Sequence, residues 1–284
     1  MILDGKLISK KRKEQLKNEV IELIDKYHIV PKLAIIMVGN NPASEIYVRN
    51  KIKAASFCHM EAELVKLDET ILMPELLAII DRLNKDDTIH GIIAQLPLPK
   101  HLNEQLVIDS ICEAKDIDGF GVKNKGRLFC GLPCLASATP SGIITLLEEY
   151  NINVSGMNAV VVGRSNIVGK PMAMLLLNKN ATVTIAHSKT KDLKDVTSKA
   201  DLLVVAIGKP KFITKDMVKP GAIVIDVGIN RIEDHIYGDV DFDNVAPIVD
   251  YITPVPGGVG PLTIVTLLEN TKKAYLNILN NKGA

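Results

Sequence analysis

Short apolar runs alternate with helix-like segments along most of this chain, and no other feature of the sequence restricts its fold as strongly. Runs that are apolar throughout are typical of strands buried in a parallel sheet, which helices cover on both faces. The sequence therefore predicts an α/β protein. The runs occupy residues 32–39, 61–67, 89–96, 158–163, 181–187, 201–208 and 222–228.

Helical periodicity fills the stretches around these runs, and helices are expected at 6–27, 42–58, 74–84, 140–150 and roughly 261–280. The first helix should be an amphipathic surface helix. Its apolar face is expected to contain Leu7, Leu16, Val20, Leu23 and Ile24. The last helix should start at Pro261 and pack back on the first domain. One side of it carries Ile264, Leu268, Tyr275 and Ile278.

The chain of 284 residues is long enough for two domains, each with its own core. Residues 112–139 are Gly-rich and polar and exceed an ordinary connection in length, so we place a domain boundary at their end. The expected fold has two α/β domains flanking a cleft, and the second domain is a doubly wound Rossmann-type parallel sheet. The first domain should comprise residues 1–139 plus 262–284, and the second residues 140–261.

Composition excludes several classes of function. A formal net charge of +1 provides no broad basic field, which argues against nucleic-acid binding. The four cysteines show no spacing typical of a zinc site, so no metal is expected. No stretch has the length and apolar character of a membrane span, and the N-terminus lacks the apolar core of a signal peptide. A cytoplasmic protein with free thiols is therefore expected.

A candidate nucleotide site lies in the run "VVVGRSNIVGKP", where Gly163 follows a strand and Gly169 lies near the start of a helix. This is not the standard GxGxxG pattern, and such a turn is often purely structural. The next strand ends in His187 and Ser188, where an NAD enzyme would present an acid to the ribose. Without that acid, Arg164, Ser165 and Ser188 can bind a 2′-phosphate, which favours NADP over NAD. Taken singly, Arg164 is more often an exposed charge and His187 a satisfied loop residue, but their joint placement at two successive strand ends favours the nucleotide site.

A second group of polar residues falls in the first half. Tyr47 and Lys51 are four positions apart on the expected helix 42–58, so they share a face. Gln95 ends a strand, at the sheet edge where α/β proteins bind ligands. Asp118 belongs to "KDIDGF". Taken singly, Lys51 is an ordinary solvated lysine, Gln95 a loop amide and Asp118 a turn residue.

Eight motifs together resemble those of the methylenetetrahydrofolate dehydrogenase/cyclohydrolase family, in order from about residue 38 to 263. They are "VGNNPASEIYVRNKIKAA", "QLPLP", "KDIDG", "ATPSG", "VVVGRSNIVGKPMAMLL", "AHSKT", "GAIVIDVGIN" and "YITPVPGGVGPLT". The resemblance implies NADP-dependent oxidation of 5,10-methylenetetrahydrofolate and hydrolysis of the product to 10-formyltetrahydrofolate. It also implies a homodimer.

The resemblance further assigns roles to individual residues. Tyr47 would stack on the aminobenzoate part of folate, and Asp118 would bind the pterin through two N–H groups. Lys51 would serve the cyclohydrolase step, with Gln95 hydrogen-bonded to it. In "TPVPGGVGP", Pro256, Gly257 and Gly258 would contact folate and nicotinamide, and Ile229 would touch the cofactor.

Two departures from the family pattern are visible. Gly121 and Val122 follow Phe120 where the family commonly has His-Pro. The family's usual "PCTP" appears in this chain as Ser137-Ala138-Thr139-Pro140. Both concern the shape of the segment between the domains.

Two alternatives stay open: another two-domain NADP-dependent dehydrogenase resembling shikimate dehydrogenase, and a non-catalytic NADP- or folate-binding module. An enzyme resembling shikimate dehydrogenase would not require Tyr47, Lys51, Gln95 and Asp118 together. A non-catalytic binding module could have another residue in place of Lys51.

Overall fold

The computed structural model describes residues 1–233 and 235–282, which form two compact units. One, which we call the five-stranded unit, comprises Met1–Lys10 and Thr139–Thr263. The other, the three-stranded unit, comprises Lys11–Ala138 and the chain from Ile264 onward. None of the helices in the described part of the chain combines the length and apolar character that crossing a bilayer requires.

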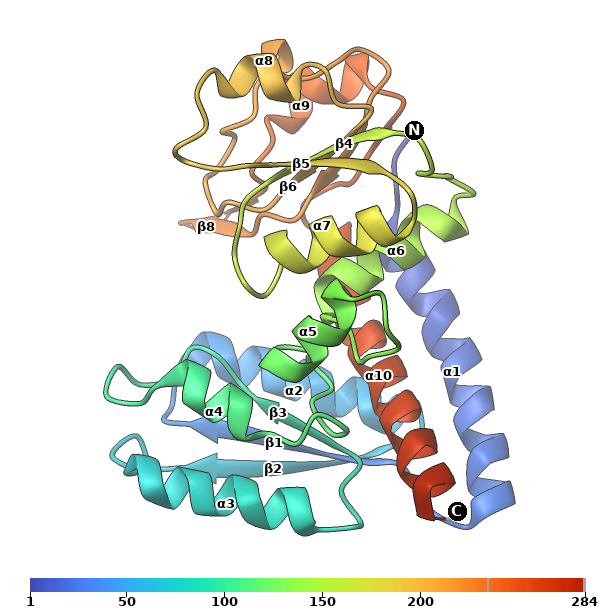
Figure 1. Ribbon diagram of the computed structural model, residues 1–284, viewed down its shortest axis with the longest axis vertical. Helices are drawn as coiled ribbons and strands as arrows, with labels where there is room; N and C mark the ends of the chain where they lie inside the picture. Colours follow the sequence, from blue (N-terminus) through green and yellow to red (C-terminus); the bar gives the residue numbers. More distant parts are fainter. Residues whose placement is uncertain (234, 283–284) are drawn as a thin grey trace. The chain divides into compact units, whose positions relative to one another are not determined.

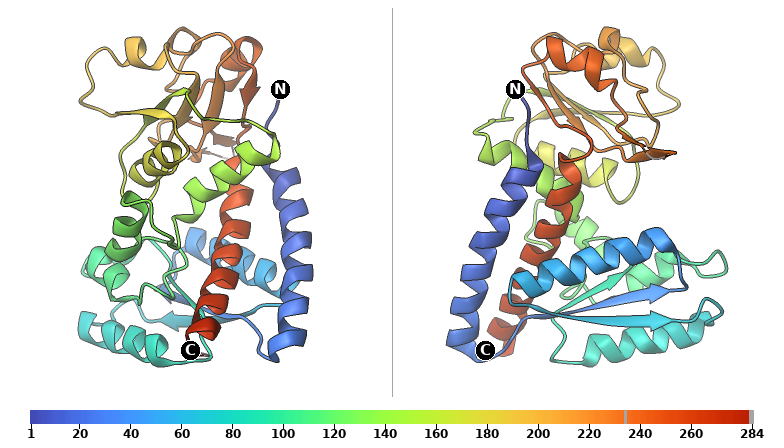
Figure 2. Two further views of the ribbon diagram at one scale, coloured as in Figure 1. Left: turned by 45° about the vertical axis from the view of Figure 1, so that its right-hand side comes forward. Right: turned by 180° about the vertical axis from the view of Figure 1, so that it is seen from behind.

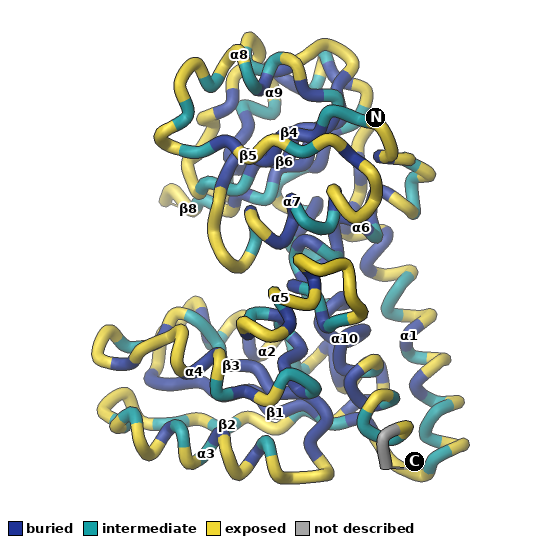
Figure 3. The backbone as a smooth tube through the Cα atoms, viewed as in Figure 1, coloured by how far each residue is buried: buried dark blue, intermediate teal, exposed yellow. Residues whose placement is uncertain are grey.

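A parallel sheet with strand order β2-β1-β3 forms the centre of the three-stranded unit (Figure 1). Strands β1 and β3 are buried, whereas the edge strand β2 is largely exposed (Figure 3). The strands are β1 (Lys32–Val38), β2 (Glu61–Leu67) and β3 (Gly91–Ala94). The helices confined to this unit are α2 (Pro42–Phe57), α3 (Met73–Lys85), α4 (Glu104–Ser110) and α5 (Val122–Phe129).

Alternate residues of β1 enter two different cores of this unit. Leu33 and Ile35 pack with α2 and with residues of α1 and α10, whereas Ala34 and Ile36 pack with α3 and α4. Helices α2 and α3 accordingly cover opposite faces of the sheet, as Figure 2 shows. This arrangement places the carboxyl ends of β1 and β3, and the start of α2, at one edge of the sheet.

The five-stranded unit contains a parallel sheet with strand order β10-β7-β6-β4-β5. The order reverses at β4, since β5 lies on one side of β4 and β6 on the other, which is the arrangement of a doubly wound nucleotide-binding fold. The strands are β4 (Asn158–Val162), β5 (Thr182–Ala186), β6 (Leu202–Val205), β7 (Ile223–Asp226) and β10 (Tyr251–Ile252). An antiparallel pair, β8 (Asn230–Ile232) and β9 (His235–Tyr237), stands apart from this sheet.

Helices cover both faces of the five-stranded sheet. One core joins β4, β6 and β7 to α6 (Ala138–Glu149) and α7 (Gly169–Asn178). The opposite core joins the same strands to α8 (Leu193–Thr197) and α9 (Phe242–Val245). Two 3-10 turns complete the unit, η1 (Lys215–Met217) and η2 (Ala246–Ile248).

Both units use residues from the two ends of the chain. Helix α1 (Gly5–Tyr27) contributes its start to the five-stranded unit and its remainder to the three-stranded unit, and α10 (Val259–Lys282) divides in the same way. In α10, Asn270 Nδ2 donates to the carbonyls of Ile117 and Ala136, both at 2.9 Å. The last helix therefore packs on the three-stranded unit as expected.

Residues 1–10 belong to the five-stranded unit, whereas the expected boundaries of 1–139 plus 262–284 grouped them with the other one. Leu3 N donates to Ile252 O and Ile252 N donates to Met1 O, so the N-terminus extends the sheet beside β10. The boundary near residue 139 and the one near 262 differ from the observed ones by one or two residues. Positions 283 and 284 lie outside the described residues.

Several local expectations need correction. The stretch 112–139 is not wholly irregular, because α5 lies within it, and α4 was not expected at all. On α1, Leu7 is exposed and Ile8 is buried in its place. Strand β5 is a largely exposed edge strand like β2, so two of the runs are not buried throughout. The sequences of the short strands β8, β9 and β10 show no periodicity that predicts a strand.

Candidate active site

Helix α2 presents Tyr47 and Lys51 on one face. Asn41 stabilises its first turn, because Asn41 Oδ1 accepts hydrogen bonds from Ala43 N at 3.0 Å and Ser44 N at 3.2 Å. Pro42 suits the first helical position. Tyr47 is 47% exposed, which is unusual for an aromatic ring. Lys51, one turn later, is half-buried. The helix thus offers an open aromatic surface next to an amine.

The amine of Lys51 is bound to Gln95, which follows β3. Lys51 Nζ donates to Gln95 Oε1 at 3.1 Å, and Gln95 Nε2 donates to Leu96 O at 2.8 Å. Because Gln95 Nε2 is bound to Leu96 O, the amide oxygen Oε1 is the atom that faces the lysine. Gln95 therefore orients Lys51 by accepting one of its three N–H groups, and two N–H groups stay available for a ligand.

Asp118 lies in a loop that its neighbours hold firmly. The buried Lys115 ammonium donates to the carbonyls of Leu83, Asn84 and Asp86 at 3.1, 2.8 and 2.7 Å. The Asp116 carboxylate accepts from Phe120 N at 3.2 Å and Gly121 N at 2.9 Å within the loop, and from Asn124 Nδ2 on α5 at 3.0 Å. Such a loop can hold one side chain in a fixed direction.

Electrostatics place Asp118 near Lys51. Burial raises the pKa of Asp118, the Lys51 charge lowers it, and the charge of Asp116 raises it further. Within the described part of the chain, no group donates a hydrogen bond to the Asp118 carboxylate. A partly desolvated carboxylate without a donor is an acceptor available to a ligand.

A second site lies where the five-stranded sheet reverses its strand order. Gly163 follows β4 with a φ of +127°, and a Cβ there would come within 2.3 Å of the Ala206 carbonyl oxygen. A Cβ on Gly169 would meet the Gly163 oxygen at 2.3 Å. The turn therefore requires both glycines, although it lacks the standard pattern, and it leads into α7.

A pocket of about 280 Å³ opens beside this turn, at the carboxyl ends of β4, β5 and β6. Arg164 and Ser188 line it, as the sequence predicts for a nucleotide site, and His187 lies beside them. Its other lining residues are Val162, Gly163, Leu193, Ala206, Ile207, Lys209 and Phe212. The lining contains cations and no acid, so it suits an anionic group rather than a free ribose 2′-hydroxyl.

Ser165 and His187 have structural partners of their own. Ser165 Oγ accepts from Val168 N at 3.1 Å and Gly169 N at 3.3 Å, so it caps the start of α7 while its own hydroxyl hydrogen can still be donated. His187 Nδ1 accepts from Lys189 N at 3.1 Å. The turn that carries Ser188 is thereby fixed.

The remaining predicted site residues belong to the five-stranded unit. Pro256 is exposed, Gly257 has a φ of +112°, and a Cβ on Gly258 would meet the Pro254 oxygen at 2.6 Å. Ile229, between β7 and β8, is 53% exposed. Tyr47, Lys51, Gln95 and Asp118 all belong to the other unit.

Sequence reasoning missed residues on the loops after β6 and β7. Lys209 and Phe212 line the nucleotide pocket, and the available signal was "GKP", which begins at the last residue of the apolar run 201–208. The buried carboxylates of Asp226 and Asp239 tie these loops together. Both aspartates lie among ordinary apolar or turn residues, so no local pattern indicates them.

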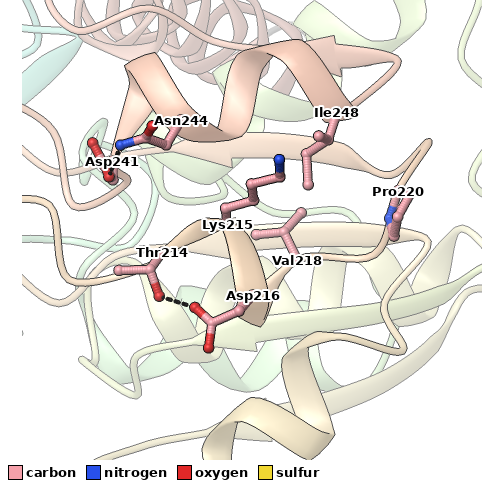
Figure 4. A pocket seen from close by; sticks show the side chains of 8 residues that line it. All are labelled: Thr214, Lys215, Asp216, Val218, Pro220, Asp241, Asn244 and Ile248. Carbon is pink, nitrogen blue, oxygen red and sulfur yellow. Dashed lines mark hydrogen bonds between the residues drawn. The ribbon is translucent and has the colours of Figure 1, made fainter.

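A larger hollow of about 590 Å³ lies near η1 and α9 (Figure 4). Thr214 Oγ1 donates to Asp216 at 2.6 Å, and Asn244 donates to Asp241 at 2.7 Å. Lys215 and Asp216 point in opposite directions (Figure 4). Because its polar groups bind one another, this hollow has no converging set of groups that would bind a ligand.

Sheet order, the glycine turn and the acid-free basic pocket indicate a two-unit α/β protein with a nucleotide site of the kind that nicotinamide-dependent dehydrogenases have. Sequence profiles then give the family. "Tetrahydrofolate dehydrogenase/cyclohydrolase, catalytic domain" matches residues 3–118, and "Tetrahydrofolate dehydrogenase/cyclohydrolase, NAD(P)-binding domain" matches residues 137–278. The chain belongs to the tetrahydrofolate dehydrogenase/cyclohydrolase family, and the family predicted from its motifs is confirmed.

Individual relatives match over nearly the whole chain. The bifunctional protein FolD of Streptococcus pneumoniae serotype 4 is 52% identical over 99% of both chains. The crystal structure of the bifunctional enzyme FolD from Campylobacter jejuni superimposes with a TM-score of 0.96 at 50% identity, covering 98% of this chain and 99% of that one. The Trypanosoma brucei FolD structure, complexed with NADP cofactor and inhibitor, has a TM-score of 0.94 at 35% identity and covers 98% of both chains.

The shikimate dehydrogenase alternative is not favoured. Shikimate dehydrogenase from Aquifex aeolicus superimposes with a TM-score of 0.54 at 9% identity, covering 88% of this chain and 97% of that one. A likeness at that level of identity shows a related fold and nothing about the reaction. The non-catalytic alternative is likewise not favoured, because the full-length relatives are named as enzymes or bifunctional proteins.

Proposed function

We propose that Lys51, held by Gln95, is the acid–base group of the cyclohydrolase step, and that Asp118 and Tyr47 hold folate beside it. The chain is a bifunctional enzyme that oxidises 5,10-methylenetetrahydrofolate to 5,10-methenyltetrahydrofolate with NADP and hydrolyses the product to 10-formyltetrahydrofolate. The observation that carries the assignment is the 3.1 Å bond between Lys51 Nζ and Gln95 Oε1, next to the acceptor carboxylate of Asp118.

In the dehydrogenase step a C–H bond of the methylene carbon breaks, and the two folate nitrogens stabilise the resulting cation. NADP, when bound, supplies the hydride acceptor. The chain's contribution is to position folate: Asp118 accepts from the N–H groups of the pterin edge, and the exposed ring of Tyr47 offers a flat surface. Positioning of this kind lowers the entropic part of the barrier without a proton transfer.

In the cyclohydrolase step water adds to the methenyl carbon and loses one proton, which leaves a hydroxyl group on that carbon. A ring nitrogen then gains a proton as its bond to the carbon breaks, and the hydroxyl group releases its proton to solvent as the formyl C=O forms. A neutral amine at Lys51 would accept the first proton and, as an ammonium, donate the second. Gln95 keeps the amine directed by its single hydrogen bond. This division of roles makes Lys51 necessary for hydrolysis and dispensable for hydride departure.

The nucleotide pocket fits NADP by the chemistry of its lining. Arg164 and Ser188 would hold the 2′-phosphate, with Ser165 as a further donor, and no lining acid would repel it. By the resemblance, Ile229 contacts the cofactor and Pro256, Gly257 and Gly258 contact folate and nicotinamide. These assignments account for the preference for NADP over NAD that we expect.

The same resemblance supports a homodimer, which light scattering on the purified protein would test.

A cytoplasmic location is supported by four free cysteines, two of them exposed, in the described part of the chain. We expect neither nucleic acid nor membrane as a partner, given a net charge of +1.

Lys51→Met tests the central assignment, because methionine keeps the apolar stem and removes the amine. With methylenetetrahydrofolate and NADP, NADPH should still form at least in part, while hydrolysis falls by roughly 10²-fold or more and methenyltetrahydrofolate accumulates. Following NADPH and methenyltetrahydrofolate separately gives both rates. Lys53→Met, on an exposed position of the same helix, is the matched control. Wild-type hydrolysis in folded Lys51→Met would show that Lys51 is a solvated lysine.

A further inference from the structure

The nucleotide pocket contains a cation, Lys209, that is not among the site residues predicted from the sequence. Three successive strand ends contribute to its lining: Arg164 after β4, Ser188 after β5 and Lys209 after β6. Lys209 is far from Arg164 in the sequence, and only the parallel sheet brings both to the same pocket. Gly169, which begins the helix expected to face the pyrophosphate, is not among the lining residues.

The structure holds Lys209 at the pocket from two sides. Its backbone N donates to the buried Asp239 Oδ1 at 2.8 Å, and Asp239 Oδ2 also accepts from Ile207 N at 2.7 Å and Gly208 N at 3.0 Å. Its Nζ lies 5.2 Å from the centroid of the Phe212 ring, within the range of a cation–π contact. Phe212 itself lines the pocket.

Lys209 also keeps its charge free for a ligand. Throughout the described residues, no carboxylate forms an ion pair with Lys209 or with Arg164. The neighbouring Lys211 differs, since its Nζ lies 3.9 Å from Asp243 and over the Tyr237 ring, and it lines a separate hollow. Two unpaired cations on one pocket without an acid form a site for an anion of more than one charge.

We infer that Lys209 is a second cation for the 2′-phosphate of NADP and, with Arg164, a specificity-determining residue against NAD. The inference rests on the proposed NADP site. A phosphate monoester carries a charge of about −1.5 to −2 at pH 7, so a single guanidinium leaves part of it unbalanced. The strand end that carries Ser188 is where α/β dehydrogenases bind the adenosine ribose, which assigns the cations to the 2′-position rather than to the pyrophosphate.

The test compares two probes that differ by the 2′-phosphate alone, adenosine 2′,5′-bisphosphate and adenosine 5′-monophosphate, bound to the full chain in calorimetry. Lys209→Gln should weaken binding of the bisphosphate by roughly 10-fold or more and leave the monophosphate unchanged, as expected for one lost charge-assisted hydrogen bond. Lys209→Arg should keep most of the affinity. Lys211→Gln, the matched control, should behave as the unmodified chain.

Kinetics provide an independent readout. In Lys209→Gln the KM for NADP should rise with kcat and the folate KM nearly unchanged, and the KM for NAD should stay constant. Equal losses for both probes, or for NADP and NAD, would overturn the inference and place Lys209 at the pyrophosphate or adenine. No loss for either would make it a solvated lysine. If the unmodified chain does not distinguish the two probes, the proposed NADP site itself fails, which is a different result.

Discussion

At the scale of single residues, the site depends on polar groups that are only partly desolvated. Asp118 has a pKa raised by burial, and Lys51 opposes that shift. The Asp118 carboxylate is therefore sensitive to acid, whereas the exposed ring of Tyr47 contributes contact area.

Asp118→Ala should weaken folate binding and lower both activities together, because both reactions use the same pose of the pterin. Wild-type folate binding should weaken as the pH falls through the raised pKa of Asp118, since protonation removes an acceptor for the pterin N–H groups. Folate KM for both reactions, measured from pH 8 to 5, checks this. Asp81→Ala, a surface change on α3, is the control. Loss of only one activity with folate affinity intact would contradict the assigned role.

At the scale of elements, two buried carboxylates join the loops after β6 and β7. Asp226 Oδ1 accepts from Gly228 N and Asp239 N, both at 2.9 Å, and Oδ2 accepts from Val240 N at 2.9 Å. Asp239 in turn holds residues 207–209. These bonds connect residues 207–209, 226–228 and 239–240. Lys209 belongs to the first of these segments, and Ile229 directly follows the second.

Asp226→Asn should destabilise the protein at pH 7 by about 1–3 kcal/mol, because an amide N–H₂ would face backbone donors. Burial raises the pKa of Asp226 to about 6, and the neighbouring charge of Asp239 also raises it, against the effect of the N–H bonds. The folded state therefore binds this proton more readily than the unfolded state. Through Asp226, stability is higher below about pH 4 and is lost as the pH rises through 6.

The wild type should accordingly gain stability relative to Asp226→Asn when the pH is lowered from 7 to 5. Urea denaturation of both proteins at the two pH values measures this difference, which should be roughly 1–1.5 kcal/mol for a pKa shifted from 3.8 to about 6. An identical gap between the two proteins at pH 5 and pH 7 would show that Asp226 does not titrate in this window.

At the scale of the whole molecule, each unit is closed by segments from distant parts of the chain. The five-stranded unit begins with residues 1–10 and resumes at residue 139. Leu3 is fully buried in the same core as Val259 and Leu262. The N-terminal residues are thus part of the nucleotide-binding unit, although most of α1 belongs to the other.

Leu3→Ala should destabilise the five-stranded unit by about 2–5 kcal/mol, the usual cost of a cavity left by leucine. Leu7→Ala, four residues later and 59% exposed, should stay within about 0.5 kcal/mol of the wild type. Chemical denaturation of the two variants makes the comparison. Similar stabilities would mean that residues 1–10 do not contribute to that core.

The sequence by itself determined the class of fold, the family and most of the candidate residues. Apolar runs alternating with helical periods predict parallel sheets because period and burial are local properties. The spacing of Tyr47 and Lys51 places them on one face for the same reason, and Gly163 with Arg164 marks the nucleotide turn.

Tertiary structure decided which distant groups meet. The bond from Lys51 to Gln95, the charge of Lys51 beside Asp118, and the position of Lys209 on the pocket of Arg164 all depend on strand order. So do the exposure of β2 and β5 as edges and the membership of residues 1–10 in the five-stranded unit. These features arise from hydrogen bonds and burial between segments far apart in the chain, which local periodicity does not encode.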